Sequence, residues 1–350
     1  MLDSVGWLPH ERDAMPPTTD HPVTERSRTW IELGSLALMW GSTFLLIKVA
    51  VPSVPAFTMA AVRGLLAAGI LWSVVTVSRR GTTATREGWM PAIVLGTLSG
   101  WLPNVLTAWA LLRLASAEAG MLSAAGPIFV VILAHFFLKS ERLNIAQAIG
   151  VVIGFIGVGL IVGINPESIQ SGDMLGKMAM IAVAVSYAAG TVYSRWIGPQ
   201  DAPRLAMRQQ LIAGLFTVPI ALAIEQPWNV RPEPVAVVAI IGLAIWAGAI
   251  PIWLYFRLIA HTRAVTVSLV AYLTPAVAVV LGVLVLGEML EPSAAVGLLV
   301  VFTGVAVTTR RQHPPVPARA IDPAAVSPIP IADGPAGSST DEGTPSDSDG

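Results

Sequence analysis

The sequence predicts an all-α integral membrane protein with ten transmembrane helices, built from two five-helix repeats of inverted orientation. Three observations support this fold class: an apolar composition, ten apolar segments long enough to span a bilayer, and a match between the two halves of the chain. Of the 350 residues, 54% are apolar and 12% are charged, and the mean hydropathy is +0.69. This composition excludes an ordinary water-soluble globule.

The charge balance and the missing residue types exclude several classes of function. Lys and Arg number 21 and Asp and Glu number 22, so no basic excess is present to bind nucleic acid. The chain has no cysteine, no phosphate-binding loop and no His-Glu-x-x-His pair for zinc. We therefore expect neither an enzyme nor a resident metal or cofactor, and we interpret the intramembrane His135 as a helix-packing residue.

Ten apolar segments follow one another between two polar tails. The tail of residues 1–29 carries charges of both signs and no apolar run, so it matches neither a cleavable signal peptide nor a spanning helix. The predicted spans are residues 30–50, 55–77, 90–112, 116–138, 144–163, 176–195, 204–224, 234–257, 264–286 and 292–309. They lack the alternation and the shorter length of barrel strands, so we expect helices. We expect the tail of residues 310–350, rich in Pro, Gly, Ser and acidic residues, to be disordered.

The Lys and Arg residues favour one side of the membrane. If the N-terminus is cytoplasmic, fifteen of them lie inside and four lie outside, and Arg63 and Arg208 fall within spans. This bias follows the positive-inside rule. Because the number of spans is even, we expect a multi-pass protein of the plasma membrane with both termini in the cytoplasm.

The two halves of the chain match at an offset of 147 residues. The matched pairs include Trp40 with Tyr187, Trp109 with Phe256, Glu141 with Glu288, Gly150 with Gly297 and Gly157 with Gly304, while Pro127 matches Pro275 at an offset of 148. We therefore divide the membrane part into one repeat at residues 30–164 and a second at residues 165–309. Five is an odd number of spans, so the second repeat enters the membrane from the opposite side. Inverted repeats are typical of secondary transporters, whose substrate sites lie near the midplane.

Three stretches of the sequence resemble a known superfamily. They are the stretch from Trp40 to Lys48, the run from Pro127 to Leu138 with the Glu141 that follows, and the run from Pro275 to Leu286 with Glu288. They are similar to the drug/metabolite transporter superfamily, and more closely to its ten-helix EamA family. The resemblance covers about residues 30–309, and Ser140 departs from the Gly that this family usually has before the Glu. It implies an exporter or exchanger of small metabolites, without indicating the substrate.

Two ionisable residues within the spans are candidates for transport roles, because a charged side chain at the bilayer centre costs about 2.5–3.5 kcal/mol on insertion scales. Arg63 either anchors an anionic or carboxylate-bearing substrate or holds backbone carbonyls and a neighbouring helix. Glu118 is either a proton-coupling site or an interfacial residue that lies near Arg113 and favours a helix N-terminus. Glu141 and Glu288 are at turns between helices, where a carboxylate can cap the next helix and fix the hairpin, so we interpret both as structural.

Prolines and aromatic residues indicate a cavity near the midplane. Kinked helices at equivalent positions of two repeats favour cavity lining or hinging, although prolines also merely bend membrane helices. These kinks are predicted at Pro127 and Pro275, with Tyr272 and Thr274 beside the latter, and at Pro103-Asn104 and Pro251. Helices 3, 4, 8 and 9 are therefore the predicted cavity walls. The aromatic residues that either stack on a ligand or pack in the protein are Trp101, Trp109, Trp246, Trp253 and Tyr272. Glycines at the equivalent positions Gly150, Gly157, Gly297 and Gly304 favour close helix approach.

Three hypotheses for the function follow from the sequence. The first is a secondary transporter that exports small metabolites, amino acids or related amphipathic compounds by alternating access. The second is an importer or exchanger of the same fold, which differs in the direction of net flux. The third is a membrane sensor or scaffold whose acidic C-terminal tail recruits partners. The expected partners are a small-molecule substrate and the lipid bilayer, and the sequence leaves the oligomeric state open.

Overall fold

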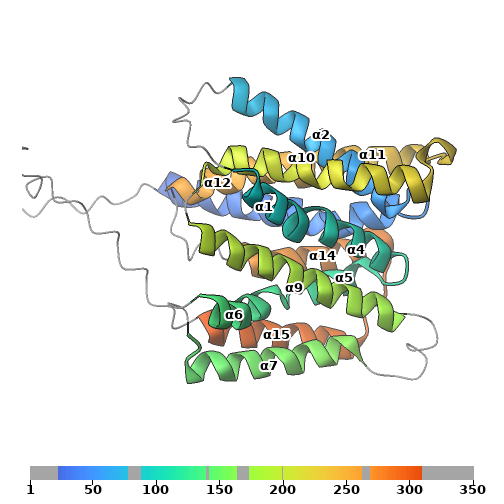
Figure 1. Cartoon of the computed structure of the whole chain (residues 1–350). Coiled ribbons are helices and arrows are strands. Elements are labelled where there is room, and N and C mark those ends of the chain that lie inside the picture. The colour runs from blue at the N-terminus through green and yellow to red at the C-terminus, as the bar shows by residue number, and fades with distance from the viewer. Residues whose placement is uncertain are drawn as a thin grey trace, which may run out of the picture. The chain divides into compact units, whose positions relative to one another are not determined.

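The computed structural model describes residues 23–77, 88–138, 142–163, 173–198, 200–261 and 269–309, all of which belong to one compact unit. These residues form helices and short connections, and they contain no β-strand. The all-helical membrane fold predicted from the sequence is confirmed (Figure 1). Both predicted tails, residues 1–29 and 310–350, fall largely outside the described residues.

The helices match the ten predicted spans. In the first repeat they are α1 (Val23–Ala50), α2 (Ala56–Val77), α3 (Met90–Gly96) with η1 (Thr97–Trp101) and α4 (Leu102–Leu111), α5 (Ser116–Ser123) with α6 (Gly126–Phe137), and α7 (Ile145–Val162). In the second repeat they are α9 (Asp173–Ile197), α10 (Ala202–Ile220) with η2 (Ala221–Glu225), the short η3 (Pro227–Asn229), α11 (Pro234–Ala244) with η4 (Ile245–Ala249) and α12 (Ile250–His261), α14 (Val270–Leu286), and α15 (Pro292–Thr309). Eight spans are long and apolar enough to cross a membrane, and α14 and α15 are shorter apolar helices.

Equivalent helices of the two repeats pack against each other. α2 lies against α10 and α7 lies against α15, and Figure 1 shows these two pairs at opposite edges of the helical bundle. The remaining contacts also come in matched sets: α1 packs on α14, and α9 packs on α5 and α6. Each repeat therefore makes the same contacts with the other, as a two-fold relation between inverted copies requires.

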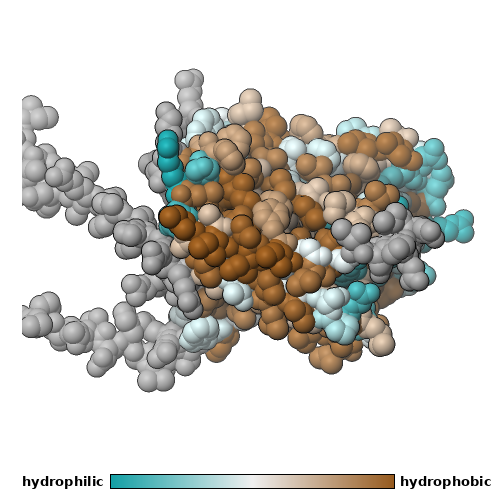
Figure 2. Space-filling view, turned by 90° about the horizontal axis from the view of Figure 1, so that it is seen from below, coloured by the Kyte–Doolittle hydropathy of each residue, from teal (hydrophilic) through white to brown (hydrophobic). Residues whose placement is uncertain are grey.

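The spans run alternately between two ends of this bundle. At one end α1, α4, α7 and α14 finish and α2, α5, α9 and α15 begin; we call it the α5 end. Figure 2 shows a hydrophobic surface between hydrophilic residues at the two ends of the bundle. Large apolar side chains such as those of Phe136, Val238 and Leu299 are exposed there. Such a belt is stable only against lipid, because contiguous apolar surface of this size is rare on soluble monomers.

Glycines bring α7 and α15 into backbone contact. A Cβ atom added at Gly150 would lie 2.7 Å from the Gly304 carbonyl oxygen, and one added at Gly157 would lie 2.7 Å from that of Gly297. All four sequence-predicted glycines thus lie at this interface, where a side chain would separate the helices. By contrast, Gly159 in the same helix has open space at its Cβ position.

Gly157 and Gly159 offer a matched test of this packing. We expect Gly157→Ala to lower the free energy of unfolding by about 1–3 kcal/mol, because the added methyl group must push α15 away. Gly159→Ala should leave stability unchanged or raise it by about 0.5–1 kcal/mol, since alanine favours the helix. Thermal unfolding of the detergent-solubilised variants measures both. Equal stability of the two variants would contradict the packing.

Candidate functional site

Two spans contain a widened helical turn at equivalent positions. The π-helical segments η1 and η4 are each five residues long, and each ends two residues before a proline, at Pro103 and Pro251. Proline has no N–H and its ring clashes with the carbonyl four residues earlier, so a wider turn relieves the clash. The sequence predicted kinks at these prolines, and the structure shows their form. Such turns free backbone carbonyls inside the membrane.

Side chains from the second repeat bind the carbonyls that η1 frees. Ser186 of α9 donates its hydroxyl to the Leu98 carbonyl oxygen at 2.7 Å, and Gln209 of α10 donates its amide to the Ser99 carbonyl oxygen at 3.4 Å. In a regular α-helix the Ser99 carbonyl would pair with residue 103, which is a proline. The two repeats are thus joined at the turn that the proline opens, because an unpaired carbonyl would be costly there.

Arg63 lies beside this turn. Its Nη1 atom donates to the Asn104 side-chain oxygen at 3.0 Å, and the hydroxyl of Tyr187 lies within electrostatic range of the guanidinium. Arg63 comes from α2, Asn104 from α4 and Tyr187 from α9, so three helices of both repeats meet here. Asn104 follows Pro103 directly, and the helix bend at this proline sets the position of its amide.

The charge of Arg63 has no counter-charge in the described part of the chain. No carboxylate pairs with its guanidinium there, and its Nε atom is buried without a hydrogen-bond partner. A buried cation that lacks a partner is expensive, and an intramembrane ionisable group in this state favours a functional site. The guanidinium retains donors that match the two oxygens of a carboxylate.

The predicted aromatic residues do not form one cluster. Trp246 of η4 donates its indole N–H to the Ser42 hydroxyl at 3.1 Å, and it is 38% exposed. Trp101 instead bonds the Thr97 hydroxyl within its own segment, and Trp253 is 49% exposed. Trp109 lies under the guanidinium of Arg113, whose Cζ atom is 3.8 Å from the ring centre. Trp109 is therefore occupied by a cation of its own chain.

The two repeat-equivalent prolines differ in their surroundings. Helix 4 is interrupted by a turn between α5 and α6, and Pro127 occupies the first turn of α6, where its missing N–H costs little. Pro275 lies inside the continuous helix α14. Thr274 bonds the Val270 carbonyl of its own helix at 2.8 Å, and Tyr272 packs on Phe302 of α15 with ring centres 5.8 Å apart. Both side chains thus have partners away from Arg63.

Carboxylates from the second repeat cap helices of the first repeat at the α5 end. Glu288 accepts hydrogen bonds from the backbone N–H groups of Ser116 and Ala117 at 2.6 and 2.8 Å, and from the Ser116 hydroxyl at 3.0 Å. The helix that Glu288 caps is thus α5, and not α15, which follows it in the chain. The Glu288 turn folds back onto the N-terminus of α5, which lies beside the C-terminus of α14. Glu141 lies outside the described residues.

Glu225 makes a second cap of the same kind. Its carboxylate accepts hydrogen bonds from the backbone N–H groups of Phe57 and Thr58 at 2.9 and 2.6 Å, and from the Thr58 hydroxyl at 2.7 Å. These bonds satisfy free N–H groups at the start of α2 and place a negative charge at the positive end of the helix dipole.

Two lysines bind helix C-termini at the α5 end. Lys48 donates to the carbonyl oxygens of Leu111 and Leu114 at 2.8 and 2.6 Å, behind the last turn of α4. Lys177 donates to the carbonyl oxygen of Val162, the last residue of α7, at 2.7 Å and forms an ion pair with Glu118 at 3.0 Å. Glu118 therefore pairs with Lys177, a partner that the sequence did not indicate.

Sequence reasoning did not identify Ser186, Gln209, Glu225 or Lys177 as site residues. The matched Trp40–Tyr187 pair was a usable signal, because Ser186 precedes Tyr187. Lys177 could have been found as a charged residue four positions into an apolar helix. Gln209 could have been found as a polar residue inside a spanning helix. Glu225 carries no such signal, since polar residues are ordinary near helix ends.

The paired helices, the inverted contacts and the polar groups at the π turns define a membrane transporter of the inverted-repeat class. Residues 31–163 and 174–310 both match the model of the EamA-like transporter family. The chain belongs to the EamA-like transporter family. The resemblance drawn from the sequence is confirmed.

Relatives from several organisms are similar to the chain over most of its length. An uncharacterized inner membrane transporter of Escherichia coli (strain K12), YedA, is 28% identical over 279 residues, which cover 79% of this chain and 89% of the relative. An uncharacterized transporter of Archaeoglobus fulgidus is 26% identical and covers 82% of this chain and 99% of its own length. A solved crystal structure superposes with a TM-score of 0.59 at 20% identity, covering 81% of this chain and 97% of that structure, and supports the fold.

The caps at the α5 end give a direct prediction for stability. We expect Glu288→Ala to lower the free energy of unfolding by about 2 kcal/mol, since it leaves the first N–H groups of α5 without acceptors. Glu233→Ala is the control, because Glu233 precedes α11 without any side-chain cap bond and should change stability by less than about 0.5 kcal/mol. Thermal unfolding in detergent compares them, and an equal effect of the two changes would refute the cap.

Proposed function

We propose that the chain is a secondary transporter that exports small carboxylate-bearing metabolites, such as amino acids or related acids, by alternating access. The observation that carries this proposal is the guanidinium of Arg63, whose buried Nε atom has no hydrogen-bond partner and which lacks a carboxylate partner among the described residues. A substrate carboxylate would supply the missing charge and bind the guanidinium through two oxygens. The Tyr187 hydroxyl and the Asn104 amide would complete the polar side of this site.

The position of Arg63 suits a substrate site that is lined by both repeats. Arg63 and Asn104 belong to the first repeat and Tyr187 to the second, so motion of one repeat against the other changes the geometry around the guanidinium. Trp246 and Ser42 make a second polar contact between the repeats within the spans. Exposed aromatic rings such as that of Trp246 fit an apolar or aromatic part of the substrate.

The charge distribution supports an orientation with both termini in the cytoplasm. Fifteen Lys and Arg residues lie on the side of the N-terminus and four on the other. In this orientation the α5 end, with its caps and ion pairs, faces outward. Export then requires substrate to enter from the cytoplasmic end and to leave at the α5 end.

The export proposal is tested by comparing the medium and the cell extract of expressing cells. We expect a carboxylate-bearing compound to be enriched in the medium of cells that express the parent protein. Cells that express a Pro127→Leu, Pro275→Leu double variant are the comparison, because this variant alters both repeat-equivalent prolines. Depletion from the medium with accumulation inside would instead show import, and no difference between the parent and empty-vector cells would contradict transport.

Substrate anchoring by Arg63 is tested with two substitutions. We expect Arg63→Gln to reduce flux of the identified compound at least about tenfold, because the carboxylate loses its ionic partner. Arg63→Lys keeps the charge but loses the planar fork of donors, so it should restore flux only in part. Uptake into everted membrane vesicles gives the rates.

The control for this experiment is Arg208→Gln. Arg208 is also within a spanning segment, and its guanidinium lies 5.2 Å from the ring of Trp89, away from Arg63. This variant should transport at nearly the parent rate. Equal flux of the parent and Arg63→Gln, at equal amounts in the membrane, would show that Arg63 is not the anchor.

A further inference from the structure

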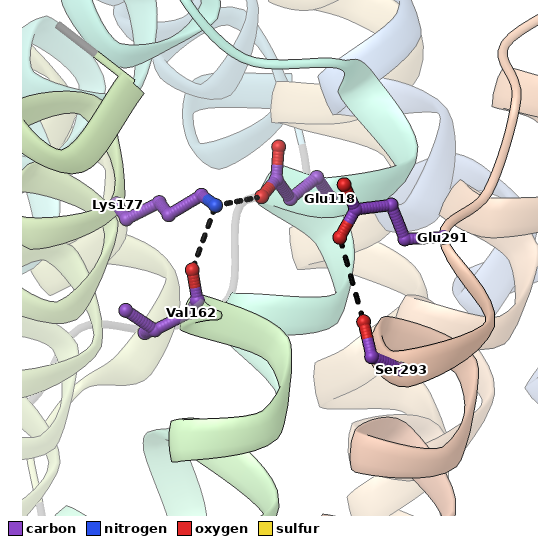
Figure 3. Close-up of polar contacts among 5 residues, drawn as sticks. All are labelled: Glu118, Val162, Lys177, Glu291 and Ser293. Atoms are coloured by element: carbon purple, nitrogen blue, oxygen red, sulfur yellow. Dashed lines mark hydrogen bonds and ion pairs between the residues drawn. The ribbon is translucent and has the colours of Figure 1, made fainter. Parts of the chain in front are cut away.

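A partly buried ion pair connects the two repeats at the α5 end. The Oε1 atom of Glu118 lies 3.0 Å from the Nζ atom of Lys177, and the side chains are 22% and 9% exposed. Figure 3 shows the Lys177 ammonium between this carboxylate and the Val162 carbonyl oxygen, which it reaches at 2.7 Å. Glu118 and Val162 belong to the first repeat and Lys177 belongs to the second. One ammonium therefore joins two helices of one repeat to the other repeat.

The contact ties the two repeats together at the α5 end in this structure. Glu118 stands in the first turn of α5, and Lys177 stands in the first turns of α9, which packs on α5. One residue before Lys177, Gly176 packs directly on Leu114, which is 1% exposed. If the repeats rock to open this end, the ion pair must break, because its two residues are on opposite repeats.

Two further carboxylates lie near the Glu118–Lys177 pair. Asp173 of α9 and Glu291, which precedes α15, both lie within electrostatic range of the Glu118 carboxylate. Figure 3 shows Glu291 beside Glu118, with its own hydrogen bond from Ser293 at 3.4 Å. The Glu118 carboxylate therefore has one ammonium and two further carboxylates in its surroundings. Binding of a proton to one of them reduces the repulsion among them.

The other charged groups at this end are occupied by helix termini. The carboxylate of Glu288 binds the N-terminal N–H groups of α5, and the ammonium of Lys48 binds carbonyls at the end of α4. Arg113 lies over the ring of Trp109. Among the described residues, Glu118 is thus the carboxylate that forms the ion pair with Lys177, and a change in its charge acts on that contact.

We propose that Glu118 is a proton-binding site that controls the opening of the α5 end. The ionised carboxylate holds Lys177 and keeps the two repeats together. A proton that binds to the carboxylate oxygen leaves a neutral acid, which no longer attracts the ammonium as an ion does, and the end opens. No other bond forms or breaks in this step. Acidity on the side that the α5 end faces therefore favours the open state. The inference rests on the proposed transport function, because only alternating access gives the opening a role.

The protein offers a convenient background for the test, because the chain of 350 residues has no cysteine. A single Leu114→Cys substitution reports opening, since this buried side chain contacts α9 across the repeat interface. Met289→Cys is the reference, because Met289 is 95% exposed at the same end and should react at all times. The full-length protein in lipid nanodiscs is labelled with a maleimide, and the rate at residue 114 is divided by that at residue 289.

In the parent we expect slow labelling at about pH 8 and faster labelling as the pH is lowered, because a proton on the Glu118 carboxylate removes its charge and with it the ion pair to Lys177. Glu118→Gln mimics the protonated acid, so it should label about tenfold faster at pH 8, as expected when a minor open state becomes the main one. Its normalised rate should no longer depend on pH.

Glu291→Gln is the matched control. It removes a neighbouring carboxylate but leaves the pair with Lys177 intact, so labelling at pH 8 should stay slow. The proposal is overturned if Glu118→Gln labels as slowly as the parent, or if its labelling still accelerates at low pH. If Glu118→Gln does not insert as a folded protein, labelling of the parent and of Lys177→Gln is compared across the same pH values. Lys177→Gln lacks the ion pair, so it should label fast at every pH.

The labelling experiment separates this inference from the transport function. It measures opening of the α5 end without any substrate. The role of the Glu118–Lys177 ion pair is therefore tested even if no flux of carboxylates is found. Conversely, slow labelling at every pH together with measured export would contradict the proposed role of Glu118 and leave the transport proposal standing.

Discussion

Backbone hydrogen bonding without water is the constraint on which the rest of this structure depends. Inside a bilayer each N–H and C=O group must find a partner within the protein, and the helix ends and the turns before Pro103 and Pro251 leave such groups free. The protein meets this need with side chains from elsewhere in the chain. Glu288 and Glu225 cap helix N-termini, and Lys177 binds a helix C-terminus.

Most of these bonds cross from one repeat to the other. Glu288 and Glu225 reach from the second repeat to α5 and α2, and Ser186 and Gln209 reach from it to the carbonyls of η1. The groups that complete the backbone of one repeat are thus supplied by the other. Local helix stability and the association of the repeats are coupled, because rocking of one repeat against the other must exchange these bonds or carry them along. Contacts at the α5 end are the ones that an outward opening would strain.

The two repeats share a backbone plan but differ in chemistry. Both have a π turn before a proline in their third helix, and a glycine in each turn packs on the opposite repeat, Gly100 on Ala213 and Gly248 on Ala67. The polar groups break this symmetry. Arg63 and Asn104 occur in the first repeat, and the ring of Trp246 bonds Ser42 from the second. A two-fold scaffold therefore presents different groups on its two sides, as a site for an asymmetric molecule needs.

The sequence by itself determined the ten spans, the two repeats and the presence of Arg63 and Glu118 within them. Hydropathy and repeat spacing are properties of short stretches, and a charge in an apolar segment is visible without a fold. Only the tertiary structure decided the partners: Glu288 caps α5 across 172 positions of sequence, and Glu118 pairs with Lys177. These contacts depend on which helix ends meet in space. Helix packing between the repeats sets that, and no local pattern records it.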